Sequence, residues 1–162
     1  MIAAAVITVS DSCFDGARVD ASGPAVAERL RARGYEVADL KIVPDERDLI
    51  ANCLVSMTNA GRVRVIFTTG GTGIAVRDVT PEATRDVITR EIPGFGELMR
   101  AEGREKTPFA MLSRAIAGIL NRVLIVKLPG SPKGALESLD AILELVPHVL
   151  DLIDGHTGHT EA

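Results

Sequence analysis

The feature that most constrains the fold is a glycine-rich segment directly after an apolar run. Residues 63–69 are almost continuously apolar or β-branched, and Gly70, Gly71 and Gly73 follow within four positions. Such a run predicts a parallel strand buried on both faces. Glycines at the end of that strand let backbone N–H groups approach an anion, because no Cβ blocks the approach. We therefore expect a ligand site at the carboxyl edge of an α/β sheet.

Strand and helix patterns alternate along the chain. Strands are predicted over residues 2–9, 35–43, 63–69 and 122–128. Helices are predicted from Ser22 to Gly34, from 44–46 to 59–61, from Thr80 to 90–91, over 95–102 and 111–119, and from Ser131 onward with a kink at Pro147. The fold class is a three-layer α/β domain, with a mostly parallel sheet and helices on both faces. We assign residues 1–154 to one domain and 155–162 to a flexible tail.

Composition narrows the classes of partner. The 162 residues are 46% hydrophobic and carry a net charge of −4, which argues against binding to nucleic acid or to an anionic membrane. No stretch approaches the roughly 20 apolar residues of a membrane helix. Cys13 and Cys53 show no paired spacing, so we expect reduced thiols in a soluble cytoplasmic protein.

Two acids are candidate metal ligands. Asp78 follows the glycine segment by five residues, and Asp45 follows the second predicted strand. Mg²⁺ is commonly held by one or two carboxylates together with substrate phosphates. Asp78 could also be a solvated turn residue, and Asp45 could simply cap a helix. The predicted position of both acids at one sheet edge favours phosphoryl or nucleotidyl transfer.

Other polar groups are weaker candidates. Ser22 and Gly23 begin a helix that could receive an anion, although helix capping alone would explain Ser22. Ser113 and Arg114 could bind a phosphate. The three histidines, in the last fifteen residues, are assigned no role.

The motifs, taken together, resemble the Mog-type molybdopterin adenylyltransferases of molybdenum cofactor synthesis. The matching segments are residues 9–11, 22–24, 43–46, 69–73, 77–84, 93–97, 107–114 and 128–132, in the family's order. The resemblance implies that ATP and molybdopterin give adenylylated molybdopterin and pyrophosphate, with Mg²⁺ required. It also implies a parallel-sheet α/β domain that assembles as a homotrimer, with a possible hand-over of product to a molybdenum insertase.

The resemblance also implies roles for individual residues. Asp45 and Asp78 match the catalytic acids and metal ligands. The pterin side would include Gly70, Gly71, Thr72, Gly73, Arg77, Ser113 and Arg114. The nucleotide side would include Asp11, Ser22, Gly23, Gly130 and Ser131.

Two positions depart from the family pattern. Ala21 stands where a cationic residue commonly precedes Ser-Gly-Pro, and Lys127 stands where an uncharged residue is more usual. The alternative function is that of a non-catalytic MoaB-like protein or scaffold, which binds the pterin or a protein without transferring a nucleotide.

Overall fold

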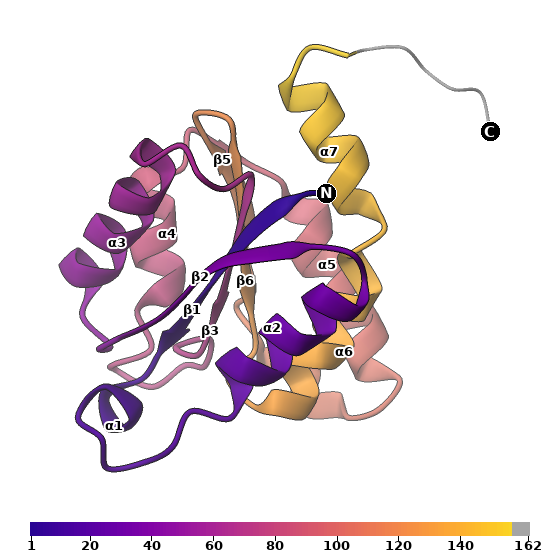
Figure 1. The fold of residues 1–162 in the computed structure, drawn as a ribbon. Coiled ribbons are helices and arrows are strands. Elements are labelled where there is room, and N and C mark those ends of the chain that lie inside the picture. Colours follow the sequence, from indigo (N-terminus) through magenta and orange to yellow (C-terminus); the bar gives the residue numbers. More distant parts are fainter. Residues whose placement is uncertain (157–162) are drawn as a thin grey trace.

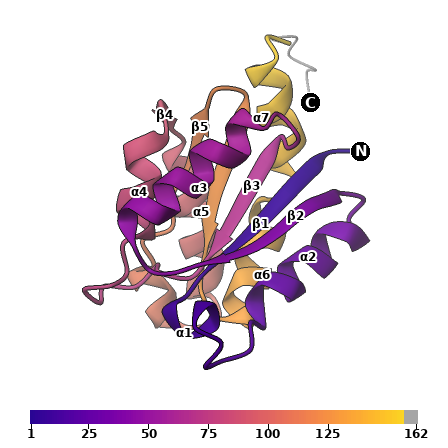
Figure 2. The same ribbon diagram turned by 60° about the vertical axis from the view of Figure 1, so that its left-hand side comes forward.

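The computed structural model describes residues 1–156 and has one sheet with helices on both faces (Figures 1 and 2). The strands are β1 (Ala3–Val9), β2 (Glu36–Val43), β3 (Val65–Thr69), β4 (Arg90–Glu91), β5 (Ala117–Leu120) and β6 (Val123–Leu128). The helices are α1 (Asp11–Phe14), α2 (Ser22–Ala32), α3 (Arg47–Asn59), α4 (Thr80–Val87), α5 (Pro93–Arg104), the 3₁₀ turn η1 (Pro108–Leu112), α6 (Pro132–Ile142) and α7 (Leu145–Ile153). The predicted three-layer α/β class is confirmed.

The sheet order is β2-β1-β3-β6-β5-β4. The first four strands are parallel, and β5 and β4 add an antiparallel edge. Strand β3 is central and buried along its whole length, which confirms the prediction made from its continuous apolar run. The loop that follows β3 therefore begins at the carboxyl edge of the parallel strands.

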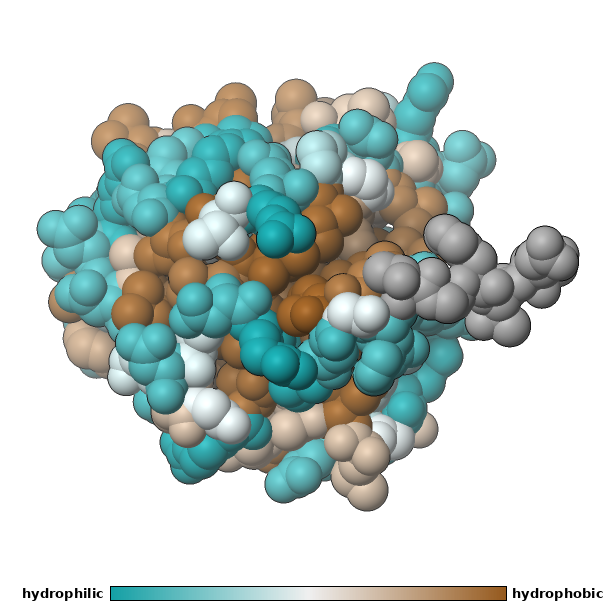
Figure 3. Space-filling view, turned by 90° about the horizontal axis from the view of Figure 1, so that it is seen from above, coloured by the Kyte–Doolittle hydropathy of each residue, from teal (hydrophilic) through white to brown (hydrophobic). Residues whose placement is uncertain are grey.

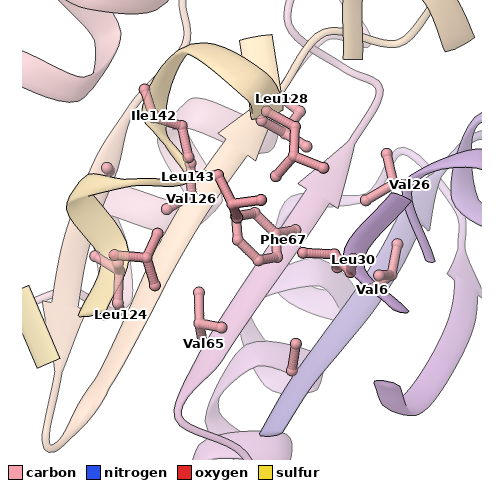
Figure 4. Close-up of a cluster of buried hydrophobic side chains, with 14 of the residues drawn as sticks. Val6, Val26, Leu30, Val65, Phe67, Leu124, Val126, Leu128, Ile142 and Leu143 are labelled. Atoms are coloured by element: carbon pink, nitrogen blue, oxygen red, sulfur yellow. The ribbon is translucent and has the colours of Figure 1, made fainter. Parts of the chain in front are cut away.

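Each face of the sheet carries its own hydrophobic cluster. Helices α3 and α4 cover one face, and α2, α5, α6 and α7 cover the other (Figure 1). Phe67 projects from β3 into the larger cluster, among side chains from α2 and α6 (Figure 4). Burying one such side chain contributes about 1.5–3 kcal/mol. The sheet is thus held rigidly from both sides.

The predicted helix over 111–119 is wrong. Residues 108–112 form the 3₁₀ turn η1, and 117–120 form β5, which pairs with β6 through a turn at Asn121 with φ of 54°. Gly118 lies so close to β4 that a Cβ there would be 2.7 Å from Arg90 O. Pairing with a buried strand satisfies this backbone and overrides local helix preference.

Two other helix predictions need correction. The helix from Thr80 ends at Val87, and residues 90–91 join the sheet as β4. The long C-terminal helix is broken, not kinked, because Pro147 has no N–H to donate to the carbonyl of Leu143. The new helix α7 starts at Leu145, with the proline in its first turn. Residues 157–162, most of the predicted tail, and His159 among them, lie outside the described residues.

The end of the molecule opposite the glycine segment carries apolar surface. Figure 3 looks onto this end, where β1 begins and α7 lies, and brown surface occupies its middle. Exposed apolar residues at this end include Met1, just before β1, and Leu145 and Leu152 of α7.

Candidate functional site

Two cavities adjoin at the carboxyl edge of the sheet. The first, of about 560 Å³, is bounded by the segments that follow β1, β2, β3 and β6. The second, of about 300 Å³, lies toward α5, η1 and α6 and has apolar walls that include Met99, Phe109 and Leu112. Ser131 lines both cavities. Its Oγ accepts a hydrogen bond from Gly134 N at 3.1 Å, which confirms that it caps α6.

The glycine segment separates the two cavities. Gly70 and Gly71 line the first, whereas Thr72 and Gly73 line the second. Gly70 and Gly71 have φ of +93° and +64°, which other residues rarely adopt. Within residues 1–156, the backbone N–H groups of residues 71–73 donate no hydrogen bond. They are therefore available as donors to an anionic ligand.

The candidate acids Asp45 and Asp78 both line the first cavity. Asp45 does not cap α3, because the N-cap position of that helix is Glu46. Instead Asp45 Oδ2 accepts from Asp11 N at 2.9 Å, and Asp11 Oδ1 accepts from Asp45 N at 3.0 Å. The alternative of a capping role for Asp45 is thus wrong.

Arg77 and Asp11 support this pair from outside the two cavities. Arg77 Nε donates to Asp11 Oδ2 at 2.6 Å and Arg77 Nη2 to Asp11 Oδ1 at 3.0 Å. These bonds from Arg77 hold the pKa of Asp11 below its ordinary value. Neither Asp11 nor Arg77 lines either of the two cavities. Their contacts instead hold Asp45 in position.

Asp45 is electrostatically strained. Its pKa is raised, first by burial and then by the nearby charges of Asp11 and Asp78, although the hydrogen bond from Asp11 N opposes the change. Negative charge that is crowded and partly desolvated favours a cation. The arrangement fits a divalent ion that shares the acids with phosphate oxygens.

Asp78 is held within the loop that follows the glycines. Its Oδ2 accepts from Ala75 N at 3.0 Å, and a Cβ at Gly73 would lie 2.6 Å from that oxygen. Arg114 Nε donates to Gly73 O at 2.9 Å, and its other nitrogens donate to Asp78 O and to the Glu82 carboxylate. Arg114, predicted to bind a phosphate, lines neither of the two cavities and braces the loop.

The start of α2 differs from the prediction. Ser22 does not cap the helix; its buried hydroxyl is hydrogen-bonded to Thr69 Oγ1 at 2.8 Å. Asp20, one residue before the N-cap Ala21, supplies an acceptor to the first turn: its Oδ1 accepts from Gly23 N at 3.1 Å, and its Oδ2 accepts from Thr8 Oγ1 at 2.7 Å. Ser22 and Asp20 line the first cavity, and Gly23 does not. The sequence reasoning missed Asp20, although an acid three residues before Gly23 is a recognisable capping signal.

The remaining predicted residues fall on both sides of the glycine segment. Gly130 lines the first cavity and packs against Gly70, where a Cβ on Gly130 would be 3.2 Å from Gly70 Cα. Ser113 lines the second cavity, and within residues 1–156 its buried Oγ has no hydrogen-bond partner. A buried hydroxyl without a partner beside a cavity fits contact with a polar ligand group.

Comparison with known proteins identifies the family. The family described as "Probable molybdopterin binding domain" matches residues 5–148. The chain belongs to this family. The resemblance inferred from its motifs is therefore confirmed.

Members of the molybdopterin-binding domain family resemble the chain over nearly its whole length. A protein of Helicobacter pylori strain J99, named molybdopterin adenylyltransferase, is 44% identical over 93% of this chain and 87% of its own. The protein of that name in Escherichia coli K12 is 35% identical over 93% and 84%. The crystal structure of the molybdopterin biosynthesis enzyme MoaB of Thermus thermophilus has a TM-score of 0.89 at 48% identity, covering 96% of this chain and 98% of that one.

Among residues 1–156, no helix combines the length and apolar character that would be needed to cross a bilayer.

Proposed function

We propose that this protein is a molybdopterin adenylyltransferase, which transfers the AMP moiety of ATP to molybdopterin and releases pyrophosphate. The observation that carries the proposal is the pair of cavities separated by the backbone N–H groups of residues 71–73, with Asp45 and Asp78 in the first. Relatives named for this activity cover 93% of the chain. The reaction requires the phosphate of the pterin to contact the α-phosphate of ATP, and two adjoining cavities can hold the substrates side by side.

The predicted subsites follow from the walls of the cavities. The first cavity, with its two acids and glycines, suits the polyphosphate of ATP and its metal. The second, with apolar walls and the Ser113 hydroxyl, suits the pterin. A phosphate oxygen of the pterin attacks the α-phosphorus of ATP, and the bond from that phosphorus to the bridging oxygen breaks. The N–H groups of residues 71–73 are placed to stabilise the negative charge on the reacting phosphates.

Magnesium fits the acids of the first cavity. Asp45 and Asp78 would hold it, and it would neutralise phosphate charge when bound. Among the residues from 1 to 156, no three His, Cys, Asp or Glu side chains are grouped to hold a metal by themselves. We therefore expect Mg²⁺ to bind weakly alone and tightly together with ATP, whose phosphates complete the ligand set.

The decisive experiment incubates the purified protein with ATP, Mg²⁺ and molybdopterin. We expect adenylylated pterin and pyrophosphate to form in equal amounts. Asp45→Asn and Asp78→Asn should each lower kcat at least about 100-fold, because either change removes a charge that holds the metal. Asp48→Asn is the matched control, because Asp48 is an exposed acid on α3 that lines neither cavity. An intact protein that forms no product would contradict the proposal.

The non-catalytic alternative remains testable with the same protein. Calorimetry should show pterin binding together with a separate ATP signal that requires Mg²⁺. Pterin binding without any ATP signal would favour a MoaB-like or scaffold role.

We further propose a cytoplasmic homotrimer that hands its product to a molybdenum insertase. The exposed apolar residues of Figure 3 are consistent with self-association, and light scattering would measure the oligomer mass.

A further inference from the structure

Lys127 is the only charged residue that is fully buried between residues 1 and 156. It lies in β6, next to Thr68 of β3 in the parallel register. Lysine is almost never fully buried unless it is paired with an acidic group. Within residues 1–156, however, Lys127 forms no salt bridge with a carboxylate. Its Nζ instead donates to Gly70 O at 2.6 Å and to Leu128 O at 3.4 Å. The buried amine therefore forms its hydrogen bonds with backbone carbonyls, including that of Gly70 in the glycine segment.

Gly70 is confined from other directions as well. A Cβ at Gly70 would lie 2.1 Å from Val9 O, and a Cβ at Gly130 would lie 3.2 Å from Gly70 Cα. Two neighbouring backbones thus fix where Gly70 lies. What remains free is the orientation of the peptide plane between Gly70 and Gly71. This plane can flip, because glycine tolerates a wide range of dihedral angles. The bond from Lys127 selects one orientation.

That orientation determines where Gly71 N–H points. The peptide bonds in the described residues are trans. In a trans peptide, the carbonyl oxygen of one residue and the N–H of the next lie on opposite sides. Because Gly70 O faces the buried amine, Gly71 N–H faces away from it. Gly71 lines the first cavity, and its N–H donates no hydrogen bond within residues 1–156.

We propose that Lys127 is a positioning residue, which orients the peptide between Gly70 and Gly71 so that Gly71 N–H binds a phosphoryl group in the first cavity. The assignment of that group to ATP rests on the proposed function, whereas the orientation of the peptide does not. Burial lowers the pKa of Lys127, and the charges of Asp78 and Asp45 oppose that change. The orienting bond survives either protonation state, because a neutral amine still has two N–H donors.

A purely structural role predicts a different result from a positioning role. Lys127→Met keeps the length of the side chain and removes a buried polar group. Thermal stability should therefore be unchanged or higher, while affinity for phosphate ligands falls. Thr68→Val is the matched control, because Thr68 is an equally buried neighbour on the same face, with a hydroxyl that has no partner among the described residues.

The experiment compares wild type, Lys127→Met, Lys127→Gln and Thr68→Val. Amide NMR spectra without ligand report on Gly71, and calorimetry gives Kd for inorganic pyrophosphate and for ATP with Mg²⁺. For Lys127→Met we expect a displaced Gly71 amide signal and a Kd about tenfold weaker for both ligands. Lys127→Gln keeps an N–H donor and should recover affinity to within about threefold. Thr68→Val should match wild type in both readouts.

The following outcomes contradict the proposal or the function on which it rests. An unchanged Gly71 signal with unchanged Kd in Lys127→Met overturns the proposal, and so does a lower Tm with unchanged Kd. If wild type binds pyrophosphate but not ATP, the proposed function fails while the positioning role is still decided by the variants. If Lys127→Met does not fold, a wild-type Gly71 amide signal that does not move when pyrophosphate is added overturns the proposal, because the N–H is then not the donor.

Discussion

Asp11 and Asp45 exchange hydrogen bonds, each backbone N–H donating to the carboxylate of the other residue at 2.9 and 3.0 Å. They follow β1 and β2, which are adjacent parallel strands, so the exchange joins two loops at one end of the sheet. Arg77 completes the arrangement with two bonds to Asp11. The acid that faces the first cavity is therefore positioned by a second acid that does not line it.

Asp11→Ala should lower both stability and turnover. The variant loses the acceptor of Asp45 N and the partner of Arg77, so we expect about 0.5–1.5 kcal/mol less stability at pH 7 and a kcat about tenfold lower. The pKa of Asp11 is held below 3.8, so its contribution is present above that pH and is lost as pH falls through the folded-state pKa. Thermal unfolding from pH 2 to 7 should show the two proteins converging at low pH.

Asp140→Ala is the control for this change. Asp140 forms an ion pair with Arg29 at a similar exposure, 36% against 38% for Asp11, and lines neither cavity. Its loss should leave kcat unchanged. Equal effects of the two substitutions on kcat would contradict the positioning of Asp45 by Asp11.

Asp45→Asn should stabilise the folded protein, although it lowers kcat at least about 100-fold. Burial raises the folded-state pKa of Asp45 above 3.8, so the unfolded chain ionises first, and wild-type stability falls as pH rises through this window. The amide cannot ionise but can still accept from Asp11 N. Calorimetric melts should show the variant's advantage growing from pH 3.8 upward and then levelling off. A variant less stable than wild type at pH 7 would refute this explanation.

Gly70→Ala should be among the most destabilising single changes at the site. The added Cβ would lie 2.1 Å from Val9 O, at a φ of +93°, so we expect a loss of at least about 3 kcal/mol. Gly16→Ala is the control, because Gly16 has φ of +77° but no atom within 4 Å of an added Cβ. That change should cost only about 1 kcal/mol. Urea unfolding of both variants measures the difference, and similar losses would mean that Gly70 is required for its dihedral angles alone.

Arg114→Met should lower turnover by about 10- to 100-fold without removing a cavity wall. The guanidinium contacts Gly73, Asp78 and Glu82, so its loss frees the loop that carries Asp78, the proposed catalytic acid. Burial opposes ionisation of Glu82, but the bond from Arg114 outweighs it and lowers the pKa of Glu82. Steady-state kinetics on Arg114→Met and on the control Arg29→Met provide the check. The two arginines have similar exposure, 33% and 34%, so matching kinetics in both variants would exclude the bracing role.

The site shows where sequence reasoning succeeds. Residues close together in the chain, such as Gly70 and Gly71 after β3 or Ser131 before α6, carry their own local signal of turn and cap. Asp45 and Asp78 were assigned to one edge by a general rule for parallel strands, and both do line the first cavity.

Several of the errors arise because the hydrogen-bond partner that decides the structure lies outside the segment that carries the local pattern. Ser22 has the pattern of a cap, but its hydroxyl is hydrogen-bonded to Thr69, 47 residues away, and Asp20 accepts from the first turn of α2 instead. The local pattern predicts a helix that includes residues 117–119, but in the structure residues 117–120 form a strand that pairs with β6. Lys127 stands out in the sequence only as a departure from a motif, because nothing local reveals that its side chain is buried beneath Gly70.

The sequence by itself determined the alternation of strands and helices, the central buried strand and the glycine segment, because periodicity and glycine content act over a few residues. Only the tertiary structure decided which polar groups meet: Asp11 with Asp45, Arg114 with the loop at Asp78, and Lys127 with Gly70. Such hydrogen bonds require donor and acceptor atoms about 3 Å apart. These atoms come from segments far apart in the sequence, and the order of the strands in the sheet brings them together.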